Sequence, residues 1–151
     1  MALWAVLAGA VGAAEWGGLT PGETTQPAVE RLYGQPTRTR VITEEGRTAE
    51  EWTYAGDRAP RGIERMVLGF GLIRSGRFDP RLLRSVTLYP APRLFTVEMI
   101  VTGWGKPDAT GEQTGRPAMR YDAKGLFIVL DRSGEWAETL LFAPERSSSD
   151  R

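Results

Sequence analysis

The chain of 151 residues contains no cysteine and no histidine. It therefore lacks disulfides, thiolate nucleophiles, zinc sites built from Cys and His, and the usual Ser-His and Cys-His catalytic pairs. Because these absences remove most routes to covalent chemistry, we expect a protein that is not an enzyme, and we predict no cofactor and no metal site.

Neither sign of charge predominates, since 19 Lys and Arg balance 19 Asp and Glu. Neutralising a phosphate backbone requires a concentration of positive charge, so we do not expect nucleic acid as a partner. Hydrophobic residues make up 41% of the chain, which is enough for a real interior. The length indicates one ordinary domain, or two very small ones that share a core.

The first 14 residues, MALWAVLAGAVGAA, carry no charged side chain. This pattern predicts a signal peptide over residues 1–14, with Gly12 and Ala14 as small residues before the cut. The segment is too short to span a bilayer as a helix, which needs about 20 residues. Since no positive charge precedes it, a misplaced start codon or a buried N-terminal helix or strand remain alternatives. We expect a periplasmic or secreted protein, with a disordered tail over residues 146–151.

From Glu15 onward, the pattern indicates short helices and strands. Thr24 or Thr25 can cap a helix in which Val29, Leu32 and Tyr33 share one face. Alternation predicts strands over 37–45, 50–55, 63–74, 84–89, 118–121, 125–131 and 138–142. Residues 108–117 are polar and predict a loop, whereas residues 93–104 fit either a helix or a strand by propensity.

The segment 63–74 is the longest strand-like stretch. Met66, Leu68, Phe70 and Leu72 line one of its faces, and Val67, Gly69, Gly71 and Ile73 line the other. Glycine is unfavourable inside a strand, so two on one face predict a close approach by another backbone, a sharp bend or strong coiling of the sheet.

Four landmarks recur in the same order in the two halves of the chain. They pair Tyr33-Gly34-Gln35-Pro36 with Trp104-Gly105-Lys106-Pro107, Trp52-Thr53-Tyr54 with Met119-Arg120-Tyr121, Arg74-Ser75-Gly76-Arg77 with Arg132-Ser133-Gly134-Glu135, and Leu88-Tyr89-Pro90 with Phe142-Ala143-Pro144. The order predicts a duplication, with one repeat over 15–90 and a second over 91–145. It also predicts a helix over 93–104, and longer loops in the first repeat.

A helix, a Gly-x-Pro turn, an aromatic strand and a hairpin resemble the unit of the SmpA/OmlA (BamE) family of small outer-membrane lipoproteins. The chain is also similar to the tandem form of that fold in β-lactamase inhibitor proteins. The resemblance rests on Leu19 to Thr24, Tyr33 to Pro36 and Trp52 to Tyr54, and on Gly105 to Pro107, Tyr121 and Gly125 to Asp131. It implies an exported α+β protein of two BamE-like repeats, with short helices packed on one face of an antiparallel sheet.

Four glutamates, Glu44, Glu45, Glu50 and Glu51, are the densest carboxylates in the chain. A pair of carboxylates can hydrolyse a glycosidic bond without histidine, so a hydrolase using Glu45 and Glu51 is one hypothesis. These residues flank a predicted turn, however, where glutamates are ordinarily solvated. We interpret them as turn residues.

Aromatic side chains on a sheet face that the helices leave open would be binding anchors. The candidates are Phe78, Trp104, Tyr121 and Trp136, although each fits a core position as well. We therefore expect a non-catalytic protein-binding or scaffold module of the cell envelope, whose partner is another envelope or secreted protein. The alternative is a carrier or sensor of a small apolar or lipid ligand, held between the sheet and the helices with the glycine face of 67–73 making room.

Overall fold

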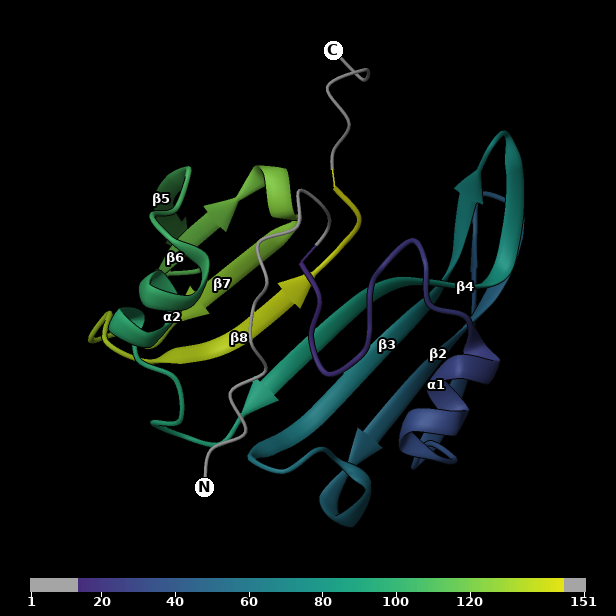
Figure 1. The fold of residues 1–151 in the computed structure, drawn as a ribbon, viewed down its shortest axis with the longest axis horizontal. Coiled ribbons are helices and arrows are strands. Elements are labelled where there is room, and N and C mark those ends of the chain that lie inside the picture. Colours follow the sequence, from purple (N-terminus) through teal and green to yellow (C-terminus); the bar gives the residue numbers. More distant parts are fainter. Residues whose placement is uncertain (1–13, 146–151) are drawn as a thin grey trace.

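The computed structural model describes residues 14–145, which form one eight-stranded antiparallel sheet and two short α-helices (Figure 1). The elements are α1 (Gln26–Tyr33), β1 (Arg38–Glu44), β2 (Arg47–Ala55), β3 (Ile63–Arg74), β4 (Arg77–Pro90), α2 (Val97–Trp104), β5 (Ala109–Gln113), β6 (Arg116–Tyr121), β7 (Leu126–Leu130) and β8 (Ala137–Phe142). The strand order across the sheet is β1-β2-β3-β4-β8-β7-β6-β5. Within residues 14–145, no helix has the length and apolar character to cross a bilayer.

The predicted signal peptide and the predicted C-terminal tail fall on residues 1–13 and 146–151, outside the described residues. Ala14, the last residue of the predicted signal peptide, is described. It is buried, and its N–H donates a hydrogen bond to the carbonyl of Lys124 at 2.9 Å. Ala14 therefore packs against the second half of the chain.

The expected fold class, an α+β arrangement of two BamE-like repeats, is wrong. Strands dominate the chain, and the helices are only eight residues long each. Helices of two turns cannot cover eight strands, so most of the buried surface comes from the sheet itself and from the loops against it. The protein is a sheet-dominated antiparallel fold.

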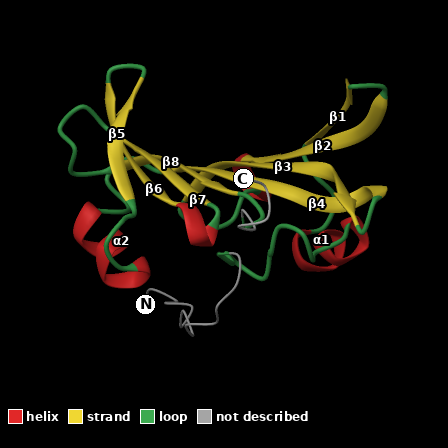
Figure 2. Cartoon of the chain, turned by 90° about the horizontal axis from the view of Figure 1, so that it is seen from above, coloured by secondary structure: helices red, strands yellow, loops and turns green. Residues whose placement is uncertain are grey.

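The two halves of the chain nevertheless share one order of elements. Each half runs from a helix through four consecutive antiparallel strands, and a short 3-10 helix follows the second strand in both, at Gly56–Arg58 and Asp122–Lys124. The halves meet where β4 pairs with β8. Figure 2 shows both helices on the same side of the sheet, while the outer strands at both ends curve toward the opposite side.

The helix predicted over 93–104 is confirmed as α2. Thr96 begins it, because its side-chain oxygen accepts a hydrogen bond from the N–H of Met99 at 3.1 Å. Gly105 ends it with a φ of 85°. Thr25 occupies the expected N-cap position of α1, but its side chain forms no capping hydrogen bond.

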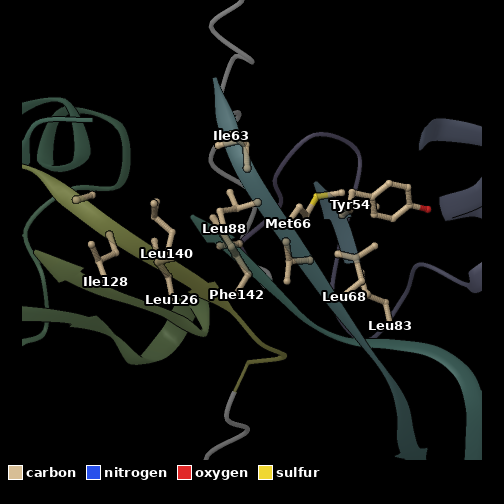
Figure 3. Packing of buried hydrophobic residues seen from close by; sticks show 14 of the residues in the cluster. Tyr54, Ile63, Met66, Leu68, Leu83, Leu88, Leu126, Ile128, Leu140 and Phe142 are labelled. Atoms are coloured by element: carbon tan, nitrogen blue, oxygen red, sulfur yellow. The ribbon is translucent and has the colours of Figure 1, made fainter. Parts of the chain in front are cut away.

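The core is continuous across the two halves. Large apolar side chains from β2, β3, β4, β7 and β8 meet on the helix side of the sheet, as Figure 3 shows for Met66, Leu88, Leu140 and Phe142. Each is fully or almost fully buried, and burial of one such side chain stabilises a fold by about 1.5–3 kcal/mol. The sheet therefore behaves as one packed layer.

Two strands differ from prediction. Residues 108–117, expected as a loop, contain β5, whose side chains are almost all exposed and lack an alternating apolar face. Ladder pairing with β6 and a two-residue turn, rather than burial, hold β5 in place. The strand predicted over 84–89 begins earlier, because β4 already pairs with β3 from Arg77.

Candidate functional site

The side of the sheet away from the helices is covered by no described helix or strand (Figure 2). Strand alternation sends Met66 and Leu68 into the core and Val67 to this other side. The register then places one row of residues across the four central strands, Val67, Thr87, Leu141 and Phe127. We call the side of the sheet that carries this row the uncovered face.

The centre of the uncovered face is largely apolar, since Val67, Leu141 and Phe127 are half-buried. Leu141 and Phe127 are adjacent in the row, and Thr87 lies between Leu141 and Val67. The outward curve of the end strands makes this face concave (Figure 2). An apolar floor inside a concave surface is the usual shape of a binding site.

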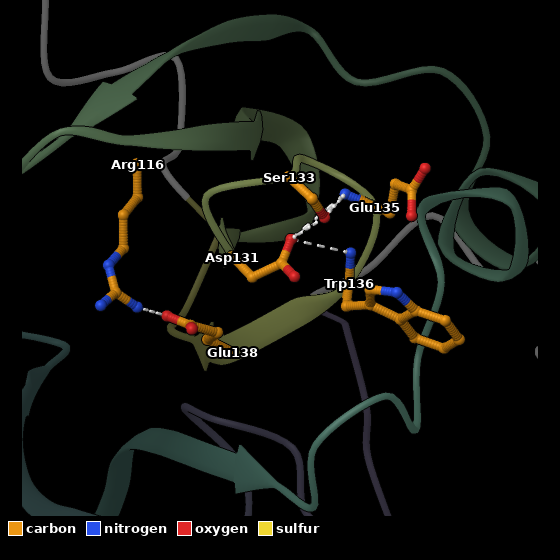
Figure 4. Close-up of polar contacts among 6 residues, drawn as sticks. All are labelled: Arg116, Asp131, Ser133, Glu135, Trp136 and Glu138. Atoms are coloured by element: carbon orange, nitrogen blue, oxygen red, sulfur yellow. Dashed lines mark hydrogen bonds and ion pairs between the residues drawn. The ribbon is translucent and has the colours of Figure 1, made fainter.

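Charged side chains surround that apolar centre. The guanidinium of Arg65 lies 4.0 Å from the centre of the Tyr89 ring, and Arg40 forms an ion pair with Glu51 at 3.0 Å. On the other half, Arg116 pairs with Glu138 (Figure 4). An apolar centre within a polar rim is the common composition of protein interfaces.

A cavity of about 550 Å³ lies at the outer end of the first half, and we call it the hairpin pocket. It is lined by Ile42, Glu44, Glu45, Arg47, Ala49, Glu50, Phe70, Gly71, Ile73, Phe78 and Arg84. The pocket exists because β3 and β4 run for 12 and 14 residues, whereas the matching β7 and β8 have only 5 and 6. The pocket lies between the far end of this hairpin and the hairpin of β1 and β2.

Two glycines of β3 lie against side chains of the neighbouring strands. A Cβ at Gly71 would lie 2.7 Å from the Cβ of Ala49, and Gly71 has a φ of 96°. A Cβ at Gly69 would lie 2.7 Å from the hydroxyl of Ser85. The atoms near both glycines belong to side chains, so the close approach by another backbone is not found there, and the β3–β4 ladder is instead irregular between Gly69 and Leu72. Gly69 shares its face of β3 with Val67, on the uncovered face.

The charges at the hairpin pocket form loose, exposed ion pairs. Arg84 lies 3.7 Å from Glu44, and Arg47 lies 3.6 Å from Glu45. The guanidinium of Arg47 is also 5.9 Å from the centre of the Phe78 ring. Balanced pairs on flexible side chains can exchange partners when a ligand arrives, at a cost of at most about 1 kcal/mol each.

The glutamates do not form a pair of free carboxylates. Glu51 is bonded to Arg40 outside the pocket lining, and Glu45 faces Arg47. Glu50 accepts a hydrogen bond from the indole N–H of Trp52 at 2.8 Å. In residues 14–145, moreover, no three acidic side chains cluster in a way that could hold a metal ion.

The four predicted binding residues do not lie together. Phe78 is half-buried and lines the hairpin pocket. Trp104 is partly buried at the end of α2, with its ring 6.0 Å from that of Phe142, and its indole N–H is buried without a described partner. Tyr121 is 3% exposed, and its hydroxyl donates to the carbonyl of Gly105 at 2.8 Å. Trp104 and Tyr121 thus belong to the helix side of the sheet.

Trp136, the fourth, follows the turn between β7 and β8, where it pairs with Thr96 just before α2. The carboxylate of Asp131 organises this turn, as Figure 4 shows. It accepts hydrogen bonds from the hydroxyl of Ser133 at 2.7 Å and from the N–H groups of Glu135 and Trp136 at 3.3 Å each. The bond from Ser133 is the main cause that lowers the pKa of Asp131, and the backbone bonds add to it. Trp136 is therefore held as part of a structured turn.

The apolar residues of the uncovered face were missed from sequence. Phe127 and Leu141 sit in strands that were predicted, next to Ile128 and Leu140 in the core. Alternation separates these neighbours into two sets, and that signal was present in the sequence. Which of the two sets the helices cover depends on the tertiary packing.

No protein-family model matches the chain, and no curated protein matches it. A solved structure with a similar fold is YjgB, a DUF4309 family protein from Bacillus subtilis subsp. subtilis str. 168. The TM-score is 0.53, the alignment covers 85% of this chain and 83% of YjgB, and 14% of the residues are identical. At that identity the likeness concerns the fold alone.

Proposed function

We propose that this chain is an exported, non-catalytic module of the cell envelope that binds another protein through the uncovered face. The observation that carries the proposal is the row of half-buried apolar residues, Val67, Leu141 and Phe127, on a concave face that no described element covers. Apolar surface of this kind is stabilised when a partner removes it from water.

The charged side chains around the apolar centre favour a protein as the partner rather than a small ligand. Ion-paired side chains such as Arg40 with Glu51 and Arg116 with Glu138 lie on both halves of the face. Charges spread around an apolar centre give orientation and association rate to a macromolecular partner. The export of the module is supported by the apolar, uncharged segment over residues 1–14.

The test compares two variants in capture experiments from cell-envelope extract. The face variant combines Phe127→Arg with Leu141→Arg, which places charge in the apolar centre. The control is Val101→Arg, because Val101 is 37% exposed on α2, away from the uncovered face. None of the three positions belongs to the buried core, so the fold should persist, and circular dichroism with thermal unfolding checks this.

We expect one reproducible protein to be captured by the native chain and by the control, and lost with the face variant. Titration of that purified protein should show at least about tenfold weaker binding by the face variant. The proposal fails if the captured proteins are the same for all three chains, or if the native chain captures none reproducibly.

A further inference from the structure

Strand β1 is one of the two ends of the sheet, and it pairs only with β2 among the described elements. All of its residues except Ile42 are exposed, and Val41 is 66% exposed. A free strand edge carries backbone groups that can pair with another strand. The side chains along this edge indicate which strand fits.

The turn between β1 and β2 fixes which backbone groups are free. Glu45 and Gly46 form a two-residue loop with φ of 51° and 73°, so Glu44 and Arg47 form a hydrogen-bonded pair. Hydrogen-bonded positions alternate along an antiparallel strand. The N–H and C=O groups of Thr39, Val41 and Thr43 therefore point outward, away from β2.

We infer that β1 is the contact through which two copies of this chain associate, pairing antiparallel with β1 of the second copy about Val41. In this register Arg38 lies opposite Glu44 of the second copy, Thr39 lies opposite its Thr43, and the two Val41 side chains meet. The strand, RTRVITE, is thus complementary to itself in charge and in shape.

The pair of Arg38 and Glu44 occurs twice in the dimer, because a symmetric dimer repeats every such pair. Three outward residues in each copy give about six backbone hydrogen bonds across the edge. Arg38 forms no ion pair within residues 14–145, so its guanidinium is available to the Glu44 of the second copy. The exposed Val41 becomes buried against its counterpart.

The register is selective. Pairing about Arg40 sets this residue opposite Arg40 of the second copy, which is unfavourable because the charges are alike. Pairing about Ile42 sets Glu44 opposite Arg40, whose guanidinium is already bonded to Glu51. The other sheet edge, β5, has the sequence ATGEQ, and pairing it with itself about Gly111 produces no ion pair and no apolar contact. The charge complementarity is therefore a property of β1.

The dimer is expected to be weak, because one strand edge buries less surface than a standard interface. Sedimentation velocity of the full chain should show a concentration-dependent dimer, with a dissociation constant on the order of 10 µM to 1 mM. A single species of monomer mass up to about 1 mM overturns the inference.

Charge reversal tests the register. Arg38→Glu alone and Glu44→Arg alone should each weaken the dimer by about tenfold or more, because each sets like charges opposite one another twice. An equimolar mixture of the two variants should associate as well as the native chain, since every pair is again of opposite charge. Absence of this rescue contradicts the proposed register.

Removal of an outward N–H tests the edge itself. Val41→Pro should abolish the dimer while leaving the monomer folded, because proline is tolerated where a strand N–H faces solvent. The matched control is Thr110→Pro, which removes an outward N–H from β5 at the opposite edge. A dimer that survives Val41→Pro, or one that Thr110→Pro disrupts equally, assigns association to a different surface and overturns the inference.

Discussion

Tyr54 and Tyr121 occupy equivalent positions in the two halves of the chain. The hydroxyl of Tyr54 donates to the carbonyl of Gly34, and the hydroxyl of Tyr121 donates to the carbonyl of Gly105, at 2.8 Å in both cases. Each glycine follows the last residue of a helix. One buried tyrosine per half thus fastens the end of a helix to the sheet, and satisfies a carbonyl that the helix leaves free.

Replacing either tyrosine by phenylalanine removes this bond and keeps the ring. We expect Tyr54→Phe and Tyr121→Phe each to lower the free energy of unfolding by about 1 kcal/mol, measured by urea denaturation. The control is Tyr89→Phe, since the Tyr89 hydroxyl bonds to no described residue and its ring contacts Arg65. An equal loss in Tyr89→Phe would show that the helix-end bonds are not the cause.

Alkaline pH tests the environment of Tyr54. Burial, with a smaller contribution from the charge of Glu30, raises the pKa of Tyr54 from 10.0 to about 12. A raised pKa means that the unfolded chain ionises first, so this contribution to stability is complete below pH 10 and is lost as the pH rises from 10 toward 12. Urea denaturation across this range should show a steeper decline for the native chain than for Tyr54→Phe. Parallel declines would contradict the assignment.

Acid pH tests the turn around Asp131. The hydroxyl of Ser133 and three backbone N–H groups lower the pKa of Asp131 below its usual 3.8. The carboxylate therefore stays ionised to a lower pH in the folded chain than in the unfolded chain. Its contribution to stability is present above the usual pKa and is lost as the pH falls through the lowered one. Asp131→Asn should therefore lower the melting temperature at pH 7, and its difference from the native chain should shrink as the pH falls below 3.8. A constant difference at every pH would exclude the carboxylate charge as the cause.

Substitution of Gly71 tests the packing at the hairpin pocket. Gly71→Ala should destabilise the protein by about 1–3 kcal/mol, because the backbone there has a φ of 96° and the new methyl group would contact Ala49 and Phe78. The control is Gly111→Ala in β5, where nothing lies within 4 Å of the added carbon. That change should stay within about 0.5 kcal/mol of the native chain. Similar losses for both would mean that the contacts with Ala49 and Phe78 do not require glycine at position 71.

Local features of the fold were predictable because neighbouring residues determine them. Glycine ends both helices at the predicted positions, with φ of 74° at Gly34 and 85° at Gly105. The alternation over 63–74 correctly separated the buried Met66 and Leu68 from Val67. Capping, turn chemistry and period-two alternation act over a few residues, so the sequence carries them directly.

The features that depend on distant contacts were not predictable in the same way. Strand β5 has no apolar alternation, and only its ladder with β6 makes it a strand. Tyr121 was a candidate anchor, but it is buried and its hydroxyl bonds to Gly105 at the end of α2, while Arg120, one residue earlier, is exposed on the other side. The sequence separates two faces of a strand without identifying which face the helices cover.

The junction between β4 and β8 has a consequence for how the chain assembles. Every other ladder in the sheet joins strands that follow one another along the chain, whereas β4 and β8 pair across the whole second half, with Val86 opposite Phe142. Hairpins close quickly because their loops are short, and distant segments meet slowly because chain entropy opposes the encounter. Each half can therefore form its hairpins independently. The pairing of β4 with β8 is the step that we expect to limit the folding rate.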